Sequence, residues 1–262
     1  MDVISAVNRD FIKAQLKNGK RIDGRGFDDI RPINITLSPI GTAEGSAFVS
    51  LGNTKILVGV KLAVDKPFPD TPDEGILITN AELRPAASPT FEPGPPNPSA
   101  IEFARVVDRG IRESGVIDLK KLCIASGEKV WVIFVDLHVL DYDGNLFDAG
   151  SYGAVAALLH ARVPSNEGSE PFDMPIKCLP VSSTFVKIDG SILLDPGLEE
   201  EQVAEARLTV VLDEENSIRA MQKGLEGGFK REEIKSMIER ASKKSVEVRE
   251  IIKGGVVYGQ KN

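Results

Sequence analysis

Three arginines have the type and spacing to do chemistry: Arg105, Arg109 and Arg112, which are four and three residues apart. At about 100° per residue, this spacing places all three within about 60° of one helical face. The guanidinium fork donates two hydrogen bonds at once, which suits the oxygens of a phosphate group. The stripe therefore predicts a cationic face that could bind a phosphate-bearing partner.

The same stripe is compatible with a solvated face held by ion pairs. Asp108 lies within reach of Arg105 and Arg112, and Glu113 lies within reach of Arg109. Taken alone, the spacing favours this ion-paired surface over a binding face.

A run of small residues from Asp148 to Gly153 is a second candidate, because a helix is predicted to open there at Gly150 or Ser151. The free N–H groups and partial positive charge of a helix N-terminus suit an anion. No basic side chain lies in this turn to hold a phosphate, however. The residues therefore favour close helix packing with a serine N-cap.

An acidic run, Glu199 to Glu201 followed by Glu205, is the third candidate. Paired carboxylates can hold magnesium or act as acid and base. Such runs are usually solvated loop faces, and the nearby Arg207 would weaken a metal site. With two histidines, two cysteines and no Cys-x-x-Cys, the residues predict no metal, no cofactor and no convincing catalytic centre.

The chain that must position these groups has 262 residues and a net charge of −7. It is long enough to bury a core without disulfides, and its acidic balance argues against a free-standing nucleic-acid-binding protein. No apolar run approaches the roughly 18 residues that cross a membrane, and residues 1–18 lack the apolar core of a signal peptide. We expect a cytoplasmic protein with Cys123 and Cys178 as reduced core thiols.

Hydrophobic periodicity in the first part of the chain predicts strands followed by helices. An amphipathic helix over 3–18 comes first, and a loop with six prolines over 85–98 separates the strands from the arginine-bearing helix. A capping box of Ser99 and Glu102 is predicted to begin that helix, which runs from about 100 to 114. The expected strands are 33–37, 46–51, 54–64, 76–83 and 130–140, and a third helix runs from 150 or 151 to about 162.

The pattern restarts after residues 163–175, which read as a linker. The expected strands there are 181–188, 191–194, 208–212 and 217–221, with an amphipathic helix over 230–252. Each half thus has strands first and a helix after. We predict an α+β fold with a duplicated β-sheet-and-helix unit, in a single domain over 1–262 with pseudo-halves 1–162 and 176–262.

Several motifs together resemble one known family. They are Arg21-Ile22-Asp23-Gly24-Arg25, Pro89-Thr90-Phe91-Glu92-Pro93-Gly94-Pro95-Pro96, the stretch from Ala104 to Arg112, and the run from Asp136 to Gly144. In this order they resemble the RNase PH family over essentially the whole chain, and most closely the non-catalytic RNase PH-like subunits of the archaeal exosome. The resemblance implies an RNase PH-like fold. It also implies a hexameric ring of three heterodimers, which shortens RNA from its 3′ end with inorganic phosphate as the attacking group.

Two positions depart from the pattern of the active members of the family. The arginine that follows their Gly-Ser/Thr pair and grips phosphate is replaced by Tyr152, which carries no charge at neutral pH. The aspartate that follows their Gly-Glu-Ala step is replaced by Arg207. Removing one electrostatic stabiliser typically costs about 10²–10³ in rate. The resemblance therefore implies a subunit that is not catalytic on its own.

The arginine helix survives, and the resemblance implies that it contacts RNA phosphates, with Arg109 and Arg112 as the strongest candidates and Arg105 as a weaker one. The implied partners are a catalytic RNase PH-like exosome subunit, RNA-binding cap subunits and single-stranded RNA, with no membrane. Two alternatives stay open. One is an active enzyme that uses Asp189, Asp195 or the run Glu199–Glu201, and the other is a scaffold without RNA contact.

Overall fold

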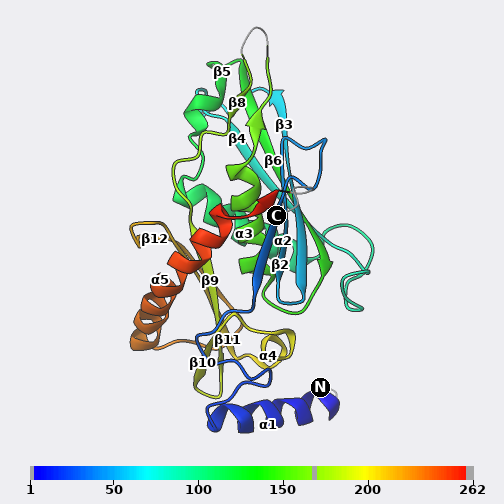
Figure 1. Cartoon of the computed structure of the whole chain (residues 1–262), viewed down its shortest axis with the longest axis vertical. Coiled ribbons are helices and arrows are strands. Elements are labelled where there is room, and N and C mark those ends of the chain that lie inside the picture. Colours follow the sequence, from blue (N-terminus) through cyan, green and yellow to red (C-terminus); the bar gives the residue numbers. More distant parts are fainter. Residues whose placement is uncertain (1–2, 167–169, 258–262) are drawn as a thin grey trace.

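The computed structural model describes residues 3–166 and 170–257, in which the largest element is a seven-stranded sheet (Figure 1). Its strands follow the order β13-β1-β2-β3-β6-β4, with β5 paired to β6. Two of the pairs, β1 with β13 and β4 with β6, are parallel, and the others are antiparallel. The strands are β1 (Ile33–Leu37), β2 (Gly45–Leu51), β3 (Thr54–Asp65), β4 (Ile76–Leu83), β5 (Cys123–Ala125), β6 (Lys129–Asp141) and β13 (Val256–Val257).

A second, four-stranded antiparallel sheet is built from the later part of the chain, in the order β10-β9-β11-β12. A short 3-10 helix, η1 (Leu119–Leu122), precedes β5, and a two-stranded sheet lies between the two larger ones in sequence. The strands are β7 (Arg162–Val163), β8 (Phe172–Asp173), β9 (Val181–Ile188), β10 (Ser191–Leu194), β11 (Ala206–Leu212) and β12 (Ile218–Gly224).

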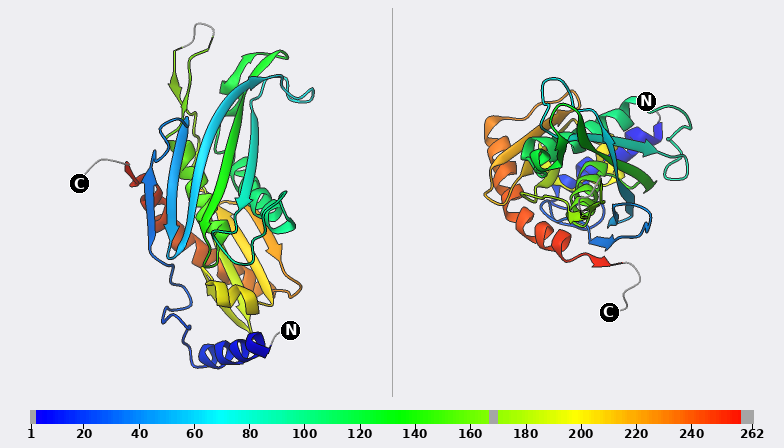
Figure 2. Two further views of the ribbon diagram at one scale, coloured as in Figure 1. Left: turned by 90° about the vertical axis from the view of Figure 1, so that its right-hand side faces the viewer. Right: turned by 90° about the horizontal axis from the view of Figure 1, so that it is seen from above.

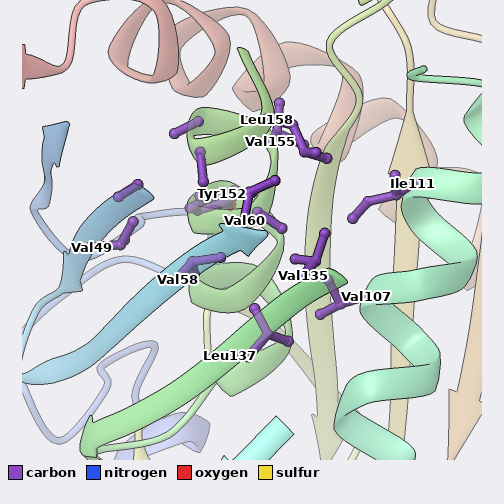
Figure 3. Close-up of a cluster of buried hydrophobic side chains, with 14 of the residues drawn as sticks. Val49, Val58, Val60, Val107, Ile111, Val135, Leu137, Tyr152, Val155 and Leu158 are labelled. Atoms are coloured by element: carbon purple, nitrogen blue, oxygen red, sulfur yellow. The ribbon is translucent and has the colours of Figure 1, made fainter. Parts of the chain in front are cut away.

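Helix α3 (Leu146–Leu159) joins the two sheets through the main hydrophobic core. It is rich in alanine and glycine, and small side chains let neighbouring backbones approach closely. A Cβ added at Gly153 would lie 2.7 Å from a methyl group of Val58, and one at Gly150 would lie 2.5 Å from the ring of Phe103. Figure 3 shows α3 surrounded by valines and leucines of β2, β3 and β6 and by side chains of α2.

The remaining helices cover the ends and flanks of the sheets (Figures 1 and 2). Helix α2 (Pro98–Ser114) packs beside α3, and α5 (Arg231–Lys253) packs on the smaller sheet through Met237 and Ala241. At one end of the molecule, α1 (Val3–Lys17) lies near α4 (Leu198–Val203) and buries Ile12 and Leu16 against side chains of β9 and β10. None of the helices described is long and apolar enough to cross a membrane.

This architecture confirms the predicted α+β fold, in which each of the two main sheets is accompanied by helices. The division into pseudo-halves 1–162 and 176–262 stays a prediction. The linker 163–175 includes the short strand β8, and its residues 167–169 lie outside the described part of the chain. Cys123 and Cys178 are free and half-buried at the edge of the apolar clusters.

Two predicted helix starts are wrong. Helix α2 is capped by Asn97, whose side chain accepts a hydrogen bond from the N–H of Ala100, so Ser99 already lies inside the helix. Proline at the first helical position, here Pro98, is a favoured arrangement because its missing N–H is not needed there. Helix α3 begins at Leu146 rather than at Gly150 or Ser151, with Asn145 as its cap in the left-handed conformation.

Candidate functional site

The arginine stripe lies on the solvent side of α2, as its spacing predicts. The helix buries Phe103, Val107 and Ile111, and ends at Gly115, whose φ of 65° is a backbone conformation that glycine adopts without strain. Three exposed guanidinium groups lie on the other side, those of Arg105, Arg109 and Arg112. We call this set the arginine face.

Arg112 is held by its own neighbours. Its guanidinium donates two hydrogen bonds of 3.0 Å to the carboxylate of Asp108 and one of 2.8 Å to the carbonyl of Leu77. Asp108 also accepts a hydrogen bond from the hydroxyl of Thr79. For this arginine the structure bears out the ion-pair interpretation, because Nε and Nη2 are used internally and only the two N–H donors of Nη1 remain for a ligand.

The other two members of the arginine face are less engaged. Arg109 donates one hydrogen bond of 2.9 Å to the side-chain oxygen of Gln222 on β12. Within the described residues Arg105 makes no hydrogen bond or ion pair, so Asp108 pairs with Arg112 and not with Arg105. A hollow of about 430 Å³ lies beside both arginines, with Pro98 and Ile101 among its apolar lining residues. These two guanidinium groups are available to an external anion.

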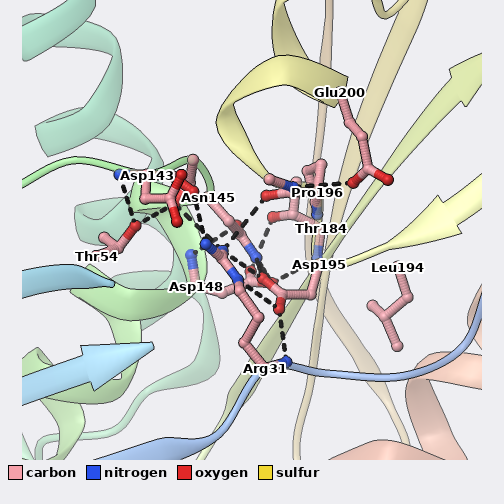
Figure 4. Close-up of polar contacts among 12 residues, drawn as sticks. Arg31, Thr54, Asp143, Asn145, Asp148, Thr184, Leu194, Asp195, Pro196 and Glu200 are labelled. Carbon is pink, nitrogen blue, oxygen red and sulfur yellow. Dashed lines mark hydrogen bonds and ion pairs between the residues drawn. The ribbon is translucent and has the colours of Figure 1, made fainter. Parts of the chain in front are cut away.

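A second arginine system is buried where the two main sheets meet (Figure 4). The carboxylate of Asp195 accepts hydrogen bonds from Nε and Nη2 of Arg31, at 2.9 and 2.7 Å, and one from the backbone N–H of the same residue. Nδ2 of Asn145 donates both to Asp195, at 2.7 Å, and to Asp148, at 2.8 Å. Thr184 completes the set by donating its N–H and its hydroxyl to Asp148. We call these five residues the buried junction.

The pKa values of the two carboxylates in the buried junction are shifted in opposite directions. Burial alone would raise the pKa of Asp195, but the hydrogen bonds and positive charge of Arg31 outweigh it and lower that pKa. Burial raises the pKa of Asp148, and its hydrogen bonds to Asn145 and Thr184 only partly offset the effect. Asp195 thus stays ionised beside its arginine, and both groups serve internal contacts.

The acidic run is only partly a solvated face, which corrects the interpretation based on sequence for Glu200 and Glu201, whereas Glu205 is exposed. Glu200 is 1% exposed and pairs with Arg21, whose Nε lies 2.9 Å from Oε1. Glu201 accepts hydrogen bonds from the hydroxyl of Tyr142 and the N–H of Asn145, and burial raises its pKa. Glu199 is exposed. The first turn of α4 therefore directs two of its three carboxylates, those of Glu200 and Glu201, toward donors that distant segments of the chain bring there.

Tyr152 fills the middle of α3 and lies in the core. It is 1% exposed, and its hydroxyl donates a hydrogen bond of 3.0 Å to the carbonyl of Ser182. Burial raises its pKa well above the ordinary value. Because Gly150 and Ser151 lie within α3, the expected serine N-cap is wrong and no helix N-terminus lies at this position to bind an anion, whereas the expected close packing is confirmed.

Arg207 lies at the beginning of β11, next to α2 and α3. Its guanidinium forms an ion pair with Glu102 of α2 and lies 4.3 Å from the ring centroid of Phe147. A Cβ at Gly224 would lie 2.5 Å from its Nη2, so any larger residue on the neighbouring strand would displace the guanidinium from this position. The sequence points to Arg207 only as a departure from the family pattern, and this contact spans 105 residues of chain.

Within the described residues no group of three or more histidine, cysteine, aspartate or glutamate side chains is arranged to hold a metal ion. The other carboxylates considered as catalytic candidates are also engaged. Asp189 lies in the turn between β9 and β10 and faces Lys17 at 3.3 Å and Lys13 at 3.9 Å. Asp195 additionally receives a hydrogen bond from Arg25.

Comparison with known proteins shows which family this sequence matches. Residues 29–164 match the model of the 3′ exoribonuclease family, domain 1 (RNase PH), and residues 178–244 match that of domain 2 of the same family. The chain is 51% identical over 261 residues to "Exosome complex component Rrp42" of Pyrococcus furiosus, which covers 96% of this chain and 94% of the relative. It is 50% identical over 255 residues to the protein of the same name from Methanocella arvoryzae, covering 97% and 98% of the two chains.

Solved structures give the same picture. A chain of "archaeoglobus fulgidus exosome with RNA bound to the active site" superimposes with a TM-score of 0.92 at 45% identity, over 95% of this chain and 99% of the other. A chain of "Archaeal exosome core" superimposes with a TM-score of 0.88 at 41% identity, over 96% and 98%.

Proposed function

This chain belongs to the 3′ exoribonuclease (RNase PH) family, and from that premise we propose that it is a non-catalytic, RNA-contacting subunit of an exosome. In this proposal it pairs with a catalytic homologue in a hexameric ring that degrades RNA from the 3′ end with phosphate. It completes the ring, supports the active site of its partner and supplies the arginine face to the path of the RNA. RNA-binding cap subunits and a cytoplasmic location are part of the same proposal.

The observation that carries the proposal is the contrast between free arginines and engaged carboxylates. Arg105 and Arg109 are exposed and have at most one internal hydrogen bond each within the described residues. The slot where active members hold phosphate contains the buried ring of Tyr152, and the slot of their aspartate contains Arg207, which is paired with Glu102. The chain therefore retains groups that bind phosphodiesters and lacks those that would activate a phosphate.

The arginine face suits RNA because it recognises the backbone and not the bases. Guanidinium groups donate to phosphate oxygens, which carry no sequence information, so binding is expected to be tolerant of sequence and to weaken with salt. The net charge of −7 does not oppose this role, because in the assembled ring the RNA would meet a local cationic surface completed by the partner.

The test uses the full-length chain assembled with its catalytic homologue and a labelled oligoadenylate. Replacing Arg105 and Arg109 together by alanine is expected to weaken RNA binding by roughly ten- to a hundred-fold, the size of one to two charge-assisted contacts, while the ring still assembles. Arg162→Ala removes an exposed arginine from an ion pair on the β7–β8 sheet and serves as the matched control. RNA affinity and processivity that stay at the level of this control would contradict the proposed role.

An enzyme active on its own is the first alternative, and the engaged carboxylates argue against it. Asp195, Asp189 and Glu200 each face arginine or lysine side chains of the same chain. Incubating the isolated chain with RNA and inorganic phosphate separates the two ideas. We expect no nucleoside diphosphates, and their release would establish activity without the partner.

A scaffold without RNA contact is the second alternative, and Arg112 is the residue that favours it, because three of its five donors are used internally. Crosslinking of a photoreactive RNA in the assembled ring distinguishes the two. Crosslinks to α2 at Arg105 or Arg109 support RNA contact, whereas crosslinks confined to other elements support the scaffold.

A further inference from the structure

The ion pair between Arg207 and Glu102 has a consequence for the arginine face. Glu102 precedes Arg105 by three residues and Arg109 by seven, so it lies on the same side of α2. All three line the hollow of about 430 Å³ beside the helix. A carboxylate in this position can pair with Arg105 along the helix, and it would then occupy the one guanidinium of the face that has no internal partner among the described residues.

In the structure the Glu102 carboxylate turns to Arg207 instead. The Glu102 side chain is 42% exposed and the Arg207 side chain is 14% exposed, so Arg207 holds the carboxylate from the protein side of the hollow. The guanidinium of Arg207 also stacks on the ring of Phe147, with its Cζ 4.3 Å from the ring centroid. The missing side chain at Gly224 leaves room for its Nη2.

Packing alone does not account for an arginine here. Its Nε is buried without a hydrogen-bond partner in the described part of the chain. Burying an incompletely paired charge is unfavourable, and apolar residues of similar volume commonly stabilise such sites better. The arginine therefore provides something that an apolar side chain would not, and the group it reaches is Glu102.

The same strand pair holds the next arginine of the face. Arg207 is paired in register with Gly224, and Thr209 with Gln222, so Gly224 and Gln222 lie two residues apart on β12 and point to the same side. Gln222 accepts the hydrogen bond from Arg109. One end of the β11–β12 pair thus contacts both Glu102 and Arg109.

We propose that Arg207 is a positioning residue for RNA binding: by holding the Glu102 carboxylate it keeps the guanidinium of Arg105 free to meet RNA phosphates. This inference rests on the proposed function, because it assumes that Arg105 contacts RNA. It assigns a role to the residue that replaces the family's aspartate.

The experiment measures binding of labelled oligoadenylate to the full-length chain, assembled with its catalytic homologue, across a range of salt concentrations. Arg207→Met removes the charge but keeps an unbranched apolar side chain over Phe147. Affinity is expected to fall about five- to ten-fold. The slope of log affinity against log salt concentration is expected to become less steep by about 0.7, the value for one phosphate contact on a single strand. Arg207→Lys, which can still pair with Glu102, should restore both quantities.

Two double variants isolate the mechanism. Arg207→Met with Glu102→Gln should regain most of the lost affinity, because no carboxylate is left to capture Arg105. Arg207→Met in an Arg105→Ala background should cause no further loss. If Arg207 only stabilises the fold, or contacts RNA itself, the loss will persist in both backgrounds, and the inference is overturned.

The outcome also separates this inference from the proposed function. If Arg105→Ala weakens RNA binding but Arg207→Met does not, the inference fails and the function stands. If Arg109→Ala alone weakens binding, the inference fails in the same way. If neither Arg105→Ala nor Arg109→Ala weakens binding, the proposed function itself fails. Thermal unfolding of each variant shows whether its fold is intact, and Arg207→Lys provides a second variant should Arg207→Met not fold.

Discussion

The guanidinium groups of Arg31 and Arg109 are chemically identical and lie in opposite surroundings. Arg31 is 8% exposed, and its donors are taken up by Asp195 and by backbone carbonyls of two turns. Arg109 is exposed and makes one hydrogen bond to an amide side chain. The difference teaches that the partners of an arginine, more than its presence in a motif, separate a residue that holds the fold from one that binds a ligand.

Arg112 shows why the distinction is needed within a single helix. It belongs to the arginine face by spacing and exposure, yet it makes three internal hydrogen bonds where Arg109 makes one. The ranking based on resemblance, with Arg112 above Arg105, is therefore the part of the site that experiment should examine first.

The largest expected effect comes from breaking the buried junction. Asp195→Ala leaves the charge of Arg31 buried without its partner, so we expect the free energy of unfolding to fall by about 3–5 kcal/mol. Chemical denaturation measures this loss. Asp141→Ala, which breaks an exposed ion pair with Lys55, should cost less than about 1 kcal/mol. Equal losses in the two variants would remove the contrast between buried and exposed charges.

A second pair of variants sharpens the contrast within α2. Arg109→Ala should change the free energy of unfolding by less than about 0.5 kcal/mol and weaken RNA binding by roughly ten-fold. Arg112→Ala should do the reverse, with a loss of about 1–2 kcal/mol from its broken hydrogen bonds and a smaller change in RNA affinity. Denaturation and RNA titration of the same samples test both statements, and the reverse assignment would restore Arg112 as the principal contact.

The pH dependence of stability provides a third test of the buried junction. The pKa of Asp195 is lowered in the folded state, so the unfolded state binds more protons between that value and the ordinary aspartate pKa of about 3.9. Its stabilising contribution is therefore complete above about pH 4 and is lost as the pH falls through the folded-state pKa. Asp195→Asn should flatten this part of the stability profile, and an unchanged acid dependence would show that Asp195 does not contribute to it.

A modest effect, on stability alone, is expected at Tyr152. Tyr152→Phe removes the hydrogen bond to the Ser182 carbonyl but keeps the ring in the core, so the free energy of unfolding should fall by about 1 kcal/mol. RNA binding by the assembled ring should not change. A change in RNA affinity without loss of stability would mean that the hydroxyl reaches the binding surface, against its burial.

The elements could be predicted where their signals are local. Short apolar runs predict β1, β4, β9 and β10 at their observed bounds, and the end predicted for the arginine-bearing helix, at 114, is that of α2. The starts of α2 and α3 were missed for opposite reasons. Ser99 and Glu102 have the spacing of a capping box, but they lie just after the true start at Asn97–Pro98. The small residues of α3 are typical of a turn, but here they allow close packing of the helix.

The polar contacts of the site could be predicted only in part. The orientation of the arginine face follows from spacing on one helix. The pairs Arg21–Glu200 and Arg31–Asp195 are separated by 179 and 164 residues, so no local pattern shows that they meet. The acidic run was interpreted as solvated because composition reports charge but not the buried donors that a fold brings to it.

The amide group of Asn145 has a consequence for how this protein could be recombined with its relatives. Its nitrogen donates to Asp148, within the segment matched by the first family domain, and to Asp195, within the segment matched by the second. A chimera with a crossover between residues 164 and 178 therefore inherits the two sides of this bond from different parents. Such hybrids should fold well only when the incoming second segment carries a hydrogen-bond acceptor at the position of Asp195. The residue at that position therefore decides which second domains can be combined with this first domain.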